Sequence, residues 1–208
     1  MFLSDRDIIW AIQTRKLLVE PPPEKFDTSS FDLHLDNISE AKVWNIEKFK
    51  KDQGFVGVKR PELRIGEYNY GEFSTRYLAA PPNYDPADND RRVGVRGDQV
   101  IVKPEGFLLW QTREKIGTPP ENADFICFVE GKSTKARSGI VVHLTAPNIH
   151  VAWSGKITLE IVNLGPFDLV LQAGDAIAQA TVARVTSPPL KSATGTQTYG
   201  QESVHGSR

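Results

Sequence analysis

The sequence has a single cysteine, Cys127, among 208 residues, so a disulfide within the chain is excluded. It also lacks an apolar run long enough for a signal peptide or a membrane span, because charged residues interrupt the opening MFLSDRDIIW. Neither sign of charge is in excess, with 25 Lys and Arg against 26 Asp and Glu. Such a chain has no basic field to hold a nucleic acid polymer. We therefore expect a soluble, cytoplasmic protein that binds neither nucleic acid polymers nor membranes.

The motifs of tightly bound catalytic zinc are absent as well. A zinc deaminase or hydrolase needs HxE with CxxC, or HExxH, and one cysteine with four scattered histidines supplies neither. The G-x-S-x-G elbow of serine hydrolases does not occur either. Cys127 lies in an apolar run, which is typical of a buried, reduced thiol. We expect no zinc and no metal held by the protein itself.

The chain begins with a segment that favours an α-helix. Ser4 followed by Asp7 resembles a capping box, and isoleucines at 8, 9 and 12 fall on one side of a helix that extends to about Leu17. Three prolines at 21–23 end this helix. From Phe31 onward apolar and polar residues alternate, which predicts a half-buried strand.

The second half of the chain reads as short strands separated by turn signals such as Leu164-Gly165-Pro166. The predicted strands cover 99–103, 106–111, 125–130, 140–144, 156–163, 167–172 and 176–185. This spacing is the pattern of an all-β sandwich or barrel. We expect helix only in the opening segment and at most a turn of it at 134–138.

Two segments fit this pattern less well. Residues 37–95 are rich in charge, Pro, Asn and Tyr, and 80–92 reads as a long loop. The end of the chain, 191–208, lacks apolar periodicity, as expected of a flexible tail. We therefore predict one domain over 1–190, with a loop-rich insertion at 37–95, followed by the tail.

Residues 156–163 alternate between two faces, and this places a carboxylate beside a hydroxyl. The apolar residues share one face, whereas Thr158 and Glu160 share the other. A partly desolvated carboxylate can have its pKa raised into the range useful for proton transfer. The pattern alone also fits a glutamate that faces solvent on an exposed sheet. Glu160 is thus a candidate base.

The segment 131–137, Gly-Lys-Ser-Thr-Lys-Ala-Arg, offers backbone amides, two hydroxyls and three cations, which suit phosphate oxygens. Its spacing differs from the GxxxxGK[ST] phosphate loop, and a solvated basic turn has the same composition. His143, between two apolar residues of a predicted strand, reads as a hydrogen-bonded structural histidine. The residues alone leave a phosphate site and a surface turn both open.

Several motifs in order along the chain resemble those of the deoxycytidine triphosphate deaminase family. They are LSDRDI at 3–8, SSFDLHL at 29–35, PEGFLLWQT at 104–112, VEGKSTKARSGIVVHLTA at 129–146, WSGKITLEIVN at 153–163 and AGDAIAQ at 173–179. They cover most of the chain except 37–95. The resemblance implies a dUTPase-like fold, mainly β with an N-terminal helix, in which a distorted jelly-roll or barrel assembles as a homotrimer.

The resemblance also implies a reaction: hydrolytic deamination of a deoxycytidine nucleotide, most simply dCTP to dUTP and ammonia, without a protein-bound metal. The family's general base falls on Glu160, while Ser133 and Arg137 match residues that place the water and stabilise charge. Four further positions match substrate contacts: Lys132 and Thr134 for the triphosphate, Leu144 and Ala146 for the base edge. Mg²⁺ would bind through the triphosphate, and neighbouring subunits would share the site.

The chain departs from the family pattern in two places. Where the family has Ile-Asp-Pro-Gly, this sequence has Ile-His-Val-Ala at 149–152, so His150 replaces an aspartate that approaches the sugar hydroxyl. In the tail, Tyr199 and Gln201 match residues of a lid over the nucleotide, but the lysine before the tyrosine is replaced.

These departures leave three readings open. The chain is a dCTP deaminase, a deaminase of a modified cytosine nucleotide, or a nucleotide-binding protein of this fold with lost or altered catalysis. A dUTPase is disfavoured, because the aspartate that activates water in those enzymes is absent.

Overall fold

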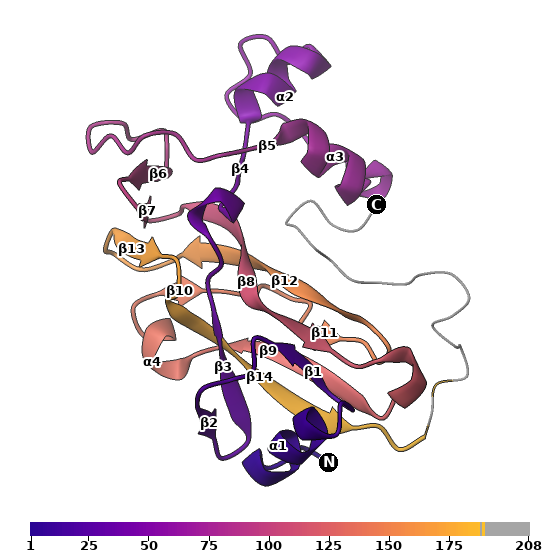
Figure 1. Ribbon diagram of the computed structural model, residues 1–208. Helices are drawn as coiled ribbons and strands as arrows, with labels where there is room; N and C mark the ends of the chain where they lie inside the picture. The colour runs from indigo at the N-terminus through magenta and orange to yellow at the C-terminus, as the bar shows by residue number, and fades with distance from the viewer. Residues whose placement is uncertain (188, 190–208) are drawn as a thin grey trace.

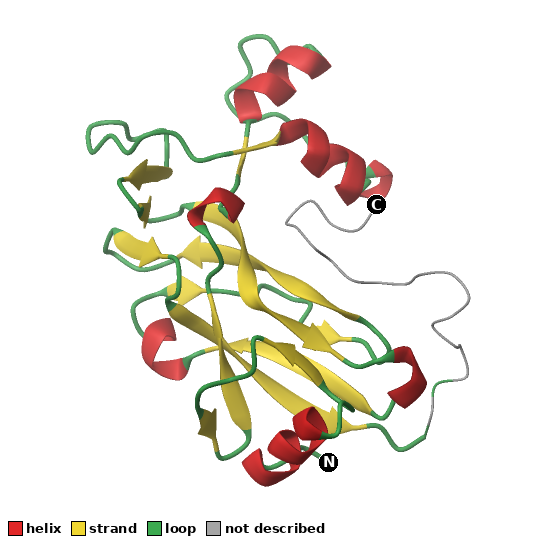
Figure 2. Ribbon diagram, viewed as in Figure 1, coloured by secondary structure: helices red, strands yellow, loops and turns green. Residues whose placement is uncertain are grey.

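The structure, a computed structural model that describes residues 1–187 and 189, is built mainly from β-strands (Figures 1 and 2). One sheet has the order β1 (Leu18–Glu20), β8 (Phe107–Gly117), β12 (Ser154–Asn163), β10 (Ile140–Val141). A second has the order β11 (Asn148–Ile149), β9 (Phe125–Gly131), β14 (Ala176–Arg184), β3 (Ser30–His34), β2 (Phe26–Asp27). Two smaller sheets are β13 (Leu169–Gln172), β7 (Gln99–Val102), β6 (Val93–Arg96), and the pair β4 (Val43–Trp44), β5 (Leu78–Ala79).

The core lies where the apolar faces of the two large sheets meet. Trp110 and Leu159 from the first sheet, and Phe31 and Cys127 from the second, are at most 1% exposed and belong to one continuous cluster. Burial raises the pKa of the Cys127 thiol to about 12, so this side chain stays protonated. This environment matches the prediction of a buried, reduced thiol.

The N-terminal helix α1 (Asp5–Gln13) forms as predicted, but it ends earlier than expected. The helix ends at Gln13, four residues before Leu17, and Arg15 beyond it adopts a left-handed conformation with φ of 58°, which cannot continue the helix. Ser4 occupies the N-cap position, yet its hydroxyl donates to Asp7 Oδ2 at 3.2 Å instead of capping a backbone amide. None of the helices in the described part of the chain is long and apolar enough to span a membrane.

Each of the seven strands predicted in the second half of the chain is present, with shifted ends. The largest difference lies in 106–111, since β8 continues to Gly117, and of 140–144 only Ile140–Val141 is strand. The short helix α4 (Ser133–Ala136) occupies the predicted turn, and the 3-10 helices are η1 (Ile38–Glu40), η2 (Ile65–Glu67) and η3 (Pro120–Asn122).

The segment 37–95 contains two helices, α2 (Ile46–Gln53) and α3 (Tyr70–Tyr77), so the expectation of helix only at the start of the chain and near 134–138 is wrong. They are capped by Asn45 and Asn69, whose side chains accept hydrogen bonds from the amides of Lys48 and Glu72. Residues 80–92 carry no helix or strand, as predicted.

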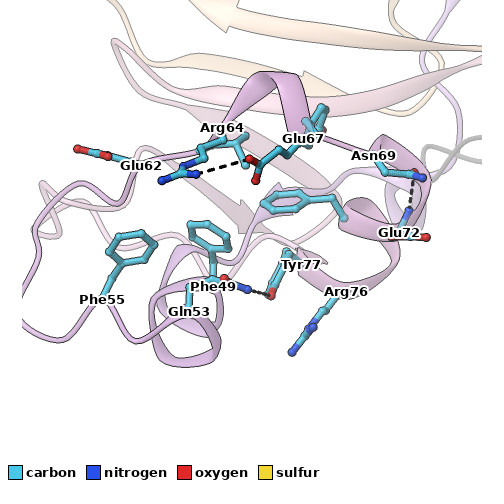
Figure 3. Close-up of a pocket in the computed structure, with 13 residues that line it drawn as sticks. Phe49, Gln53, Phe55, Glu62, Arg64, Glu67, Asn69, Glu72, Arg76 and Tyr77 are labelled. Carbon is cyan, nitrogen blue, oxygen red and sulfur yellow. Dashed lines mark hydrogen bonds and ion pairs between the residues drawn. The ribbon is translucent and has the colours of Figure 1, made fainter.

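An aromatic cluster joins the two helices into one unit. The ring of Phe73 lies 5.3 Å from that of Phe49 and 4.7 Å from that of Tyr77, measured between centroids. Figure 3 shows the pocket that these helices enclose, with Phe55 at its edge and Gln53 bonded to Tyr77. In Figure 1, α2 and α3 lie at the end of the molecule opposite to α1.

Candidate active site

Glu160 lies on a pocket wall because of the alternation along β12. Leu159 and Ile161 are fully buried in the core, whereas Thr158 and Glu160 face the other side, where the Glu160 side chain is 31% exposed. The two residues line a pocket with a volume of about 830 Å³. The structure confirms the prediction that Glu160 shares one face of its strand with Thr158. The carboxylate lies in a concave site instead of on an open sheet face.

A histidine holds the carboxylate of Glu160. The Nδ1 atom of His143 lies 2.7 Å from Glu160 Oε2, and its Nε2 atom lies 2.6 Å from the carbonyl oxygen of Ala146. The His143 side chain is 7% exposed. His143 is therefore hydrogen-bonded, as the sequence predicted, and one of its partners is the candidate base.

The surroundings of His143 favour its protonated form. The hydrogen bond to Glu160 raises the pKa of the imidazole above its usual value; burial opposes this, and the charge of Glu160 and the Ala146 carbonyl add to the rise. Both ring nitrogens face acceptors, and only an imidazolium can donate to both. The geometry and the pKa shift therefore agree on a His143 cation beside the Glu160 carboxylate.

Four of the residues predicted for the site meet in this pocket. Leu144, Ala146, His150 and Glu160 all line it. Among the described residues that line the pocket, none is lysine or arginine. The pocket therefore offers a carboxylate, two histidines and apolar surface, and its described lining lacks the lysine and arginine side chains that would suit a triphosphate.

The basic segment lies elsewhere on the same chain. Ser133 and Thr134 are exposed on α4, Arg137 follows that helix, and Lys132 forms an ion pair with Asp32 on β3. None of these four predicted site residues lines the Glu160 pocket. A single chain thus does not bring the two halves of the predicted site together.

The turn that carries the unusual Ile-His-Val-Ala sequence borders the pocket. His150 is exposed on it, and Ala152 adopts a left-handed conformation with φ of 62°. The amide of Ala152 donates to the hydroxyl of Thr118 at 2.7 Å, which fixes the turn against the end of β8. Glycine adopts this left-handed conformation more readily than alanine does. Ala152 is therefore less suited than glycine to the backbone conformation of this turn.

A family model described as dCTP deaminase-like matches residues 2–185. The chain belongs to the dCTP deaminase-like family. A dCTP deaminase of Thermomicrobium roseum is 29% identical over 100% of this chain and 93% of its own. A protein of Nocardioides sp., named a dUMP-forming dCTP deaminase, is 30% identical over 90% of this chain and 82% of its own. A relative named dCTP deaminase and one named dUMP-forming dCTP deaminase thus have similar sequence identity to this chain.

A solved structure with the dCTP deaminase name shares the fold. The 2'-deoxycytidine 5'-triphosphate deaminase of Agrobacterium tumefaciens aligns with a TM-score of 0.56 and 16% sequence identity. The alignment covers 88% of this chain and 48% of that one, so the chain spans about half the length of that protein. The predicted fold class, mainly β with an N-terminal helix in a dUTPase-like arrangement, is confirmed.

This dCTP deaminase-like chain also places residues at the pocket that sequence reasoning missed. Trp44, Tyr68 and Tyr70 line it, and all three come from the segment 37–95. Their signal was the aromatic content of that segment, but no periodic pattern linked it to Glu160. Tyr199 and Gln201, predicted for the lid, lie outside the described residues.

Proposed function

We propose that this protein deaminates a cytosine deoxynucleotide by hydrolysis, most simply dCTP to dUTP and ammonia. The observation that supports this best is the Glu160 carboxylate, held by His143 at the wall of a pocket with apolar surfaces. Such a carboxylate is oriented before substrate arrives, as suits a general base. Membership of the dCTP deaminase-like family supplies the substrate class.

The reaction needs a group that transfers two protons in turn, one to the ring and one to the leaving amino group. Glu160 would take a proton from water as the oxygen attacks C4 of the cytosine ring, and it would pass this proton to the ring nitrogen N3 as the tetrahedral intermediate forms. Glu160 would then take the proton of the new C4 hydroxyl and give it to the amino group. The C4–N bond breaks, ammonia leaves, and a C4 carbonyl remains. His143 would hold the Glu160 carboxylate in position toward the water through its bond to Oε2.

The rest of the site would come from a neighbouring copy of the chain. We propose a homotrimer in which Ser133 and Arg137 of one subunit approach Glu160 of the next, and Lys132 and Thr134 contact the triphosphate. The support is geometric, since these residues are on or next to α4 and the pocket itself has no lysine or arginine among its described lining residues. Four negative charges on a triphosphate require such cations.

The proposal includes Mg²⁺ only as part of the substrate, bound to the triphosphate oxygens. Within residues 1–187 and 189, no three His, Cys, Asp or Glu side chains are grouped as in a metal site. We further propose that 1–190 functions as one domain with the insertion at 37–95, and that 191–208, with Tyr199 and Gln201, closes over the nucleotide.

Incubation of the purified protein with dCTP and Mg²⁺, followed by ion-exchange chromatography of the nucleotides, tests this function. A dUTP peak is the expected result. Formation of dUMP and pyrophosphate would show that His150, in place of the family aspartate, still permits a second step. Unchanged dCTP would contradict the proposal for this substrate, and 5-substituted cytosine nucleotides would then test the modified-base alternative.

A second candidate is a nucleotide-binding protein of this fold that has lost or altered catalysis. The observation that favours it is the Ile-His-Val-Ala turn, with His150 on the pocket wall and Ala152 in a left-handed conformation. Calorimetric binding of dCTP without ammonia release would support this candidate over the deaminase.

A further inference from the structure

The segment 37–95 enters the active-site region through a defined contact with the central sheet. The amide of Lys42 donates to the Leu109 carbonyl at 2.7 Å, and the Leu109 amide donates back at 2.9 Å. On its other side, Leu109 is the partner of Glu160 in the β8–β12 register. Directly opposed residues in antiparallel strands share a face of the sheet. Only β8 therefore lies between the start of the insertion and the strand of the candidate base, and Lys42 is on the same side of the sheet as Glu160.

From this contact the chain carries three aromatic rings to the pocket. Trp44, two residues after Lys42, falls on the same face as Glu160 by strand alternation. The ring of Tyr70 lies 6.4 Å from that of Trp44 at an interplanar angle of 90°, and 6.3 Å from that of Tyr68. We call these three pocket-lining residues, Trp44, Tyr68 and Tyr70, the aromatic wall.

The aromatic wall has support from behind. Phe73 of α3 lies 5.3 Å from Trp44 and 5.2 Å from Tyr68, measured between ring centroids. Phe73 in turn packs on Phe49 and Tyr77 in the cluster that joins α2 to α3. A surface held in this way by two helices presents its rings in fixed positions and loses little entropy when a ligand binds.

Tyr70 is a member of the aromatic wall whose pKa is affected by the charge of Glu160. Burial raises the pKa of its phenol, and the neighbouring Tyr68 and the charge of Glu160 raise it further. The phenol is therefore neutral near pH 7, and the Glu160 carboxylate contributes to this through its charge. The apolar side chains of Leu63 and Ile65, also from the insertion, extend the same wall.

We infer that the aromatic wall is the nucleobase-binding surface of the pocket, with Tyr70 as a specificity-determining residue that stacks on or against the ring held over Glu160. Flat, neutral, aromatic surface suits a planar pyrimidine and offers nothing to phosphate. This inference rests on the proposed function for its ligand, and it assigns the insertion a role in the same chain as the base.

The test compares Tyr70→Ala with Tyr70→Phe in the full-length protein, by steady-state deamination of dCTP. Loss of base stacking is expected to raise KM for Tyr70→Ala by roughly 5- to 150-fold, with a smaller change in kcat. Tyr70→Phe keeps the ring, so its KM should stay within about threefold of the wild type, a change of well under 1 kcal/mol. Phe55→Ala is the matched control, because it removes a ring from the same unit outside the Glu160 pocket.

The same variants are then placed in a Glu160→Gln background, and dCTP binding is measured by calorimetry. An active wild type whose KM is unchanged by Tyr70→Ala would overturn the inference and leave the proposed function intact. Binding without turnover in the wild type, weakened by Tyr70→Ala, would support the aromatic wall and overturn the deaminase. Absence of both binding and turnover would overturn the two together.

Discussion

His143 donates to Glu160 and to the Ala146 carbonyl, and these two bonds favour the protonated form of the imidazole. A neutral imidazole would have to turn a lone pair toward one acceptor, which costs a hydrogen bond in a partly buried site. The cation avoids that loss and donates a charge-assisted hydrogen bond to the Glu160 carboxylate. This hydrogen bond orients the candidate base before substrate arrives.

Replacement of Glu160 by glutamine should separate chemistry from binding. The amide is similar in size to the carboxylate but cannot accept and return a proton, so we expect ammonia release to be lost while dCTP binding is retained. A coupled ammonia assay and calorimetry measure the two quantities. Glu24→Gln, on an exposed residue outside the pocket, is the matched control. Appreciable turnover by Glu160→Gln would remove this residue from its proposed role.

Replacement of His143 by glutamine should lower stability in a pH-dependent way. The folded-state pKa of His143 is raised above the unfolded value of about 6.5, so its stabilisation is fully present below that pH and is lost as pH rises through the folded pKa. A charge-assisted hydrogen bond contributes about 1.5 to 3 kcal/mol. Urea unfolding from pH 5.5 to 9 should show the difference between wild type and variant shrink with rising pH. A difference independent of pH would contradict the charged pair.

A double-mutant cycle tests whether Glu160 is the partner that raises the pKa of His143. In the Glu160→Gln background the main cause of the raised His143 pKa is gone, so His143→Gln should have a smaller effect with little pH dependence. An equal pH dependence in both backgrounds would mean that another group holds the charge of His143.

Helix α2 depends on its two ends, because eight residues form a marginal helix on their own. At its start the Asn45 side chain caps the Lys48 amide, and at its end Gly54 adopts φ of 73° while its amide donates to the Lys50 carbonyl. The helix in turn places Phe49 behind the aromatic wall. The ends of α2 therefore matter to the pocket, although no residue of α2 lines it.

Gly54→Ala should destabilise the protein by about 1 kcal/mol, because alanine is disfavoured in the left-handed conformation. A Cβ atom at this position would meet nothing within 4 Å, so the effect comes from the backbone alone. Gly66→Ala is the matched control: it also has open space, but its φ is not positive. Chemical denaturation should show Gly66→Ala neutral or slightly stabilising. Equal effects of the two substitutions would contradict this explanation.

The sequence predicted elements best where one pattern was long and regular. In β12 the alternation of apolar and polar residues fixed which side Glu160 faces, and burial follows it residue by residue. The helices α2 and α3 were missed because each is only eight residues long, and their asparagine caps read equally well as turn residues. The aromatic wall could not be predicted, since its residues meet the Glu160 pocket through contacts between distant parts of the chain, such as the pairing of Lys42 with Leu109.

At the scale of the whole molecule, the described residues include a pocket with a carboxylate and a basic turn that does not line it. The lining of the Glu160 pocket includes two histidines, whereas Lys132, Lys135 and Arg137 are on or beside α4. A nucleotide triphosphate needs both surfaces at once. The proposed homotrimer, as a closed, symmetric assembly, would supply the missing half of each site from the next subunit and repeat the arrangement at every interface.

Subunit mixing tests this arrangement directly. Arg137→Ala and Glu160→Gln should each be inactive as uniform assemblies, because every site lacks one essential group. When the two variants are co-expressed in equal amounts, a site works if one subunit supplies intact Arg137 and its neighbour supplies intact Glu160. Random assembly of a cyclic trimer gives this pairing at about one quarter of the sites, so the mixture should recover about a quarter of wild-type dCTP deamination. Mixing Glu160→Gln with Glu160→Ala is the control and should recover nothing. If the Arg137→Ala and Glu160→Gln mixture stays inactive while light scattering shows mixed trimers, both residues must act from the same chain, and the shared site is wrong.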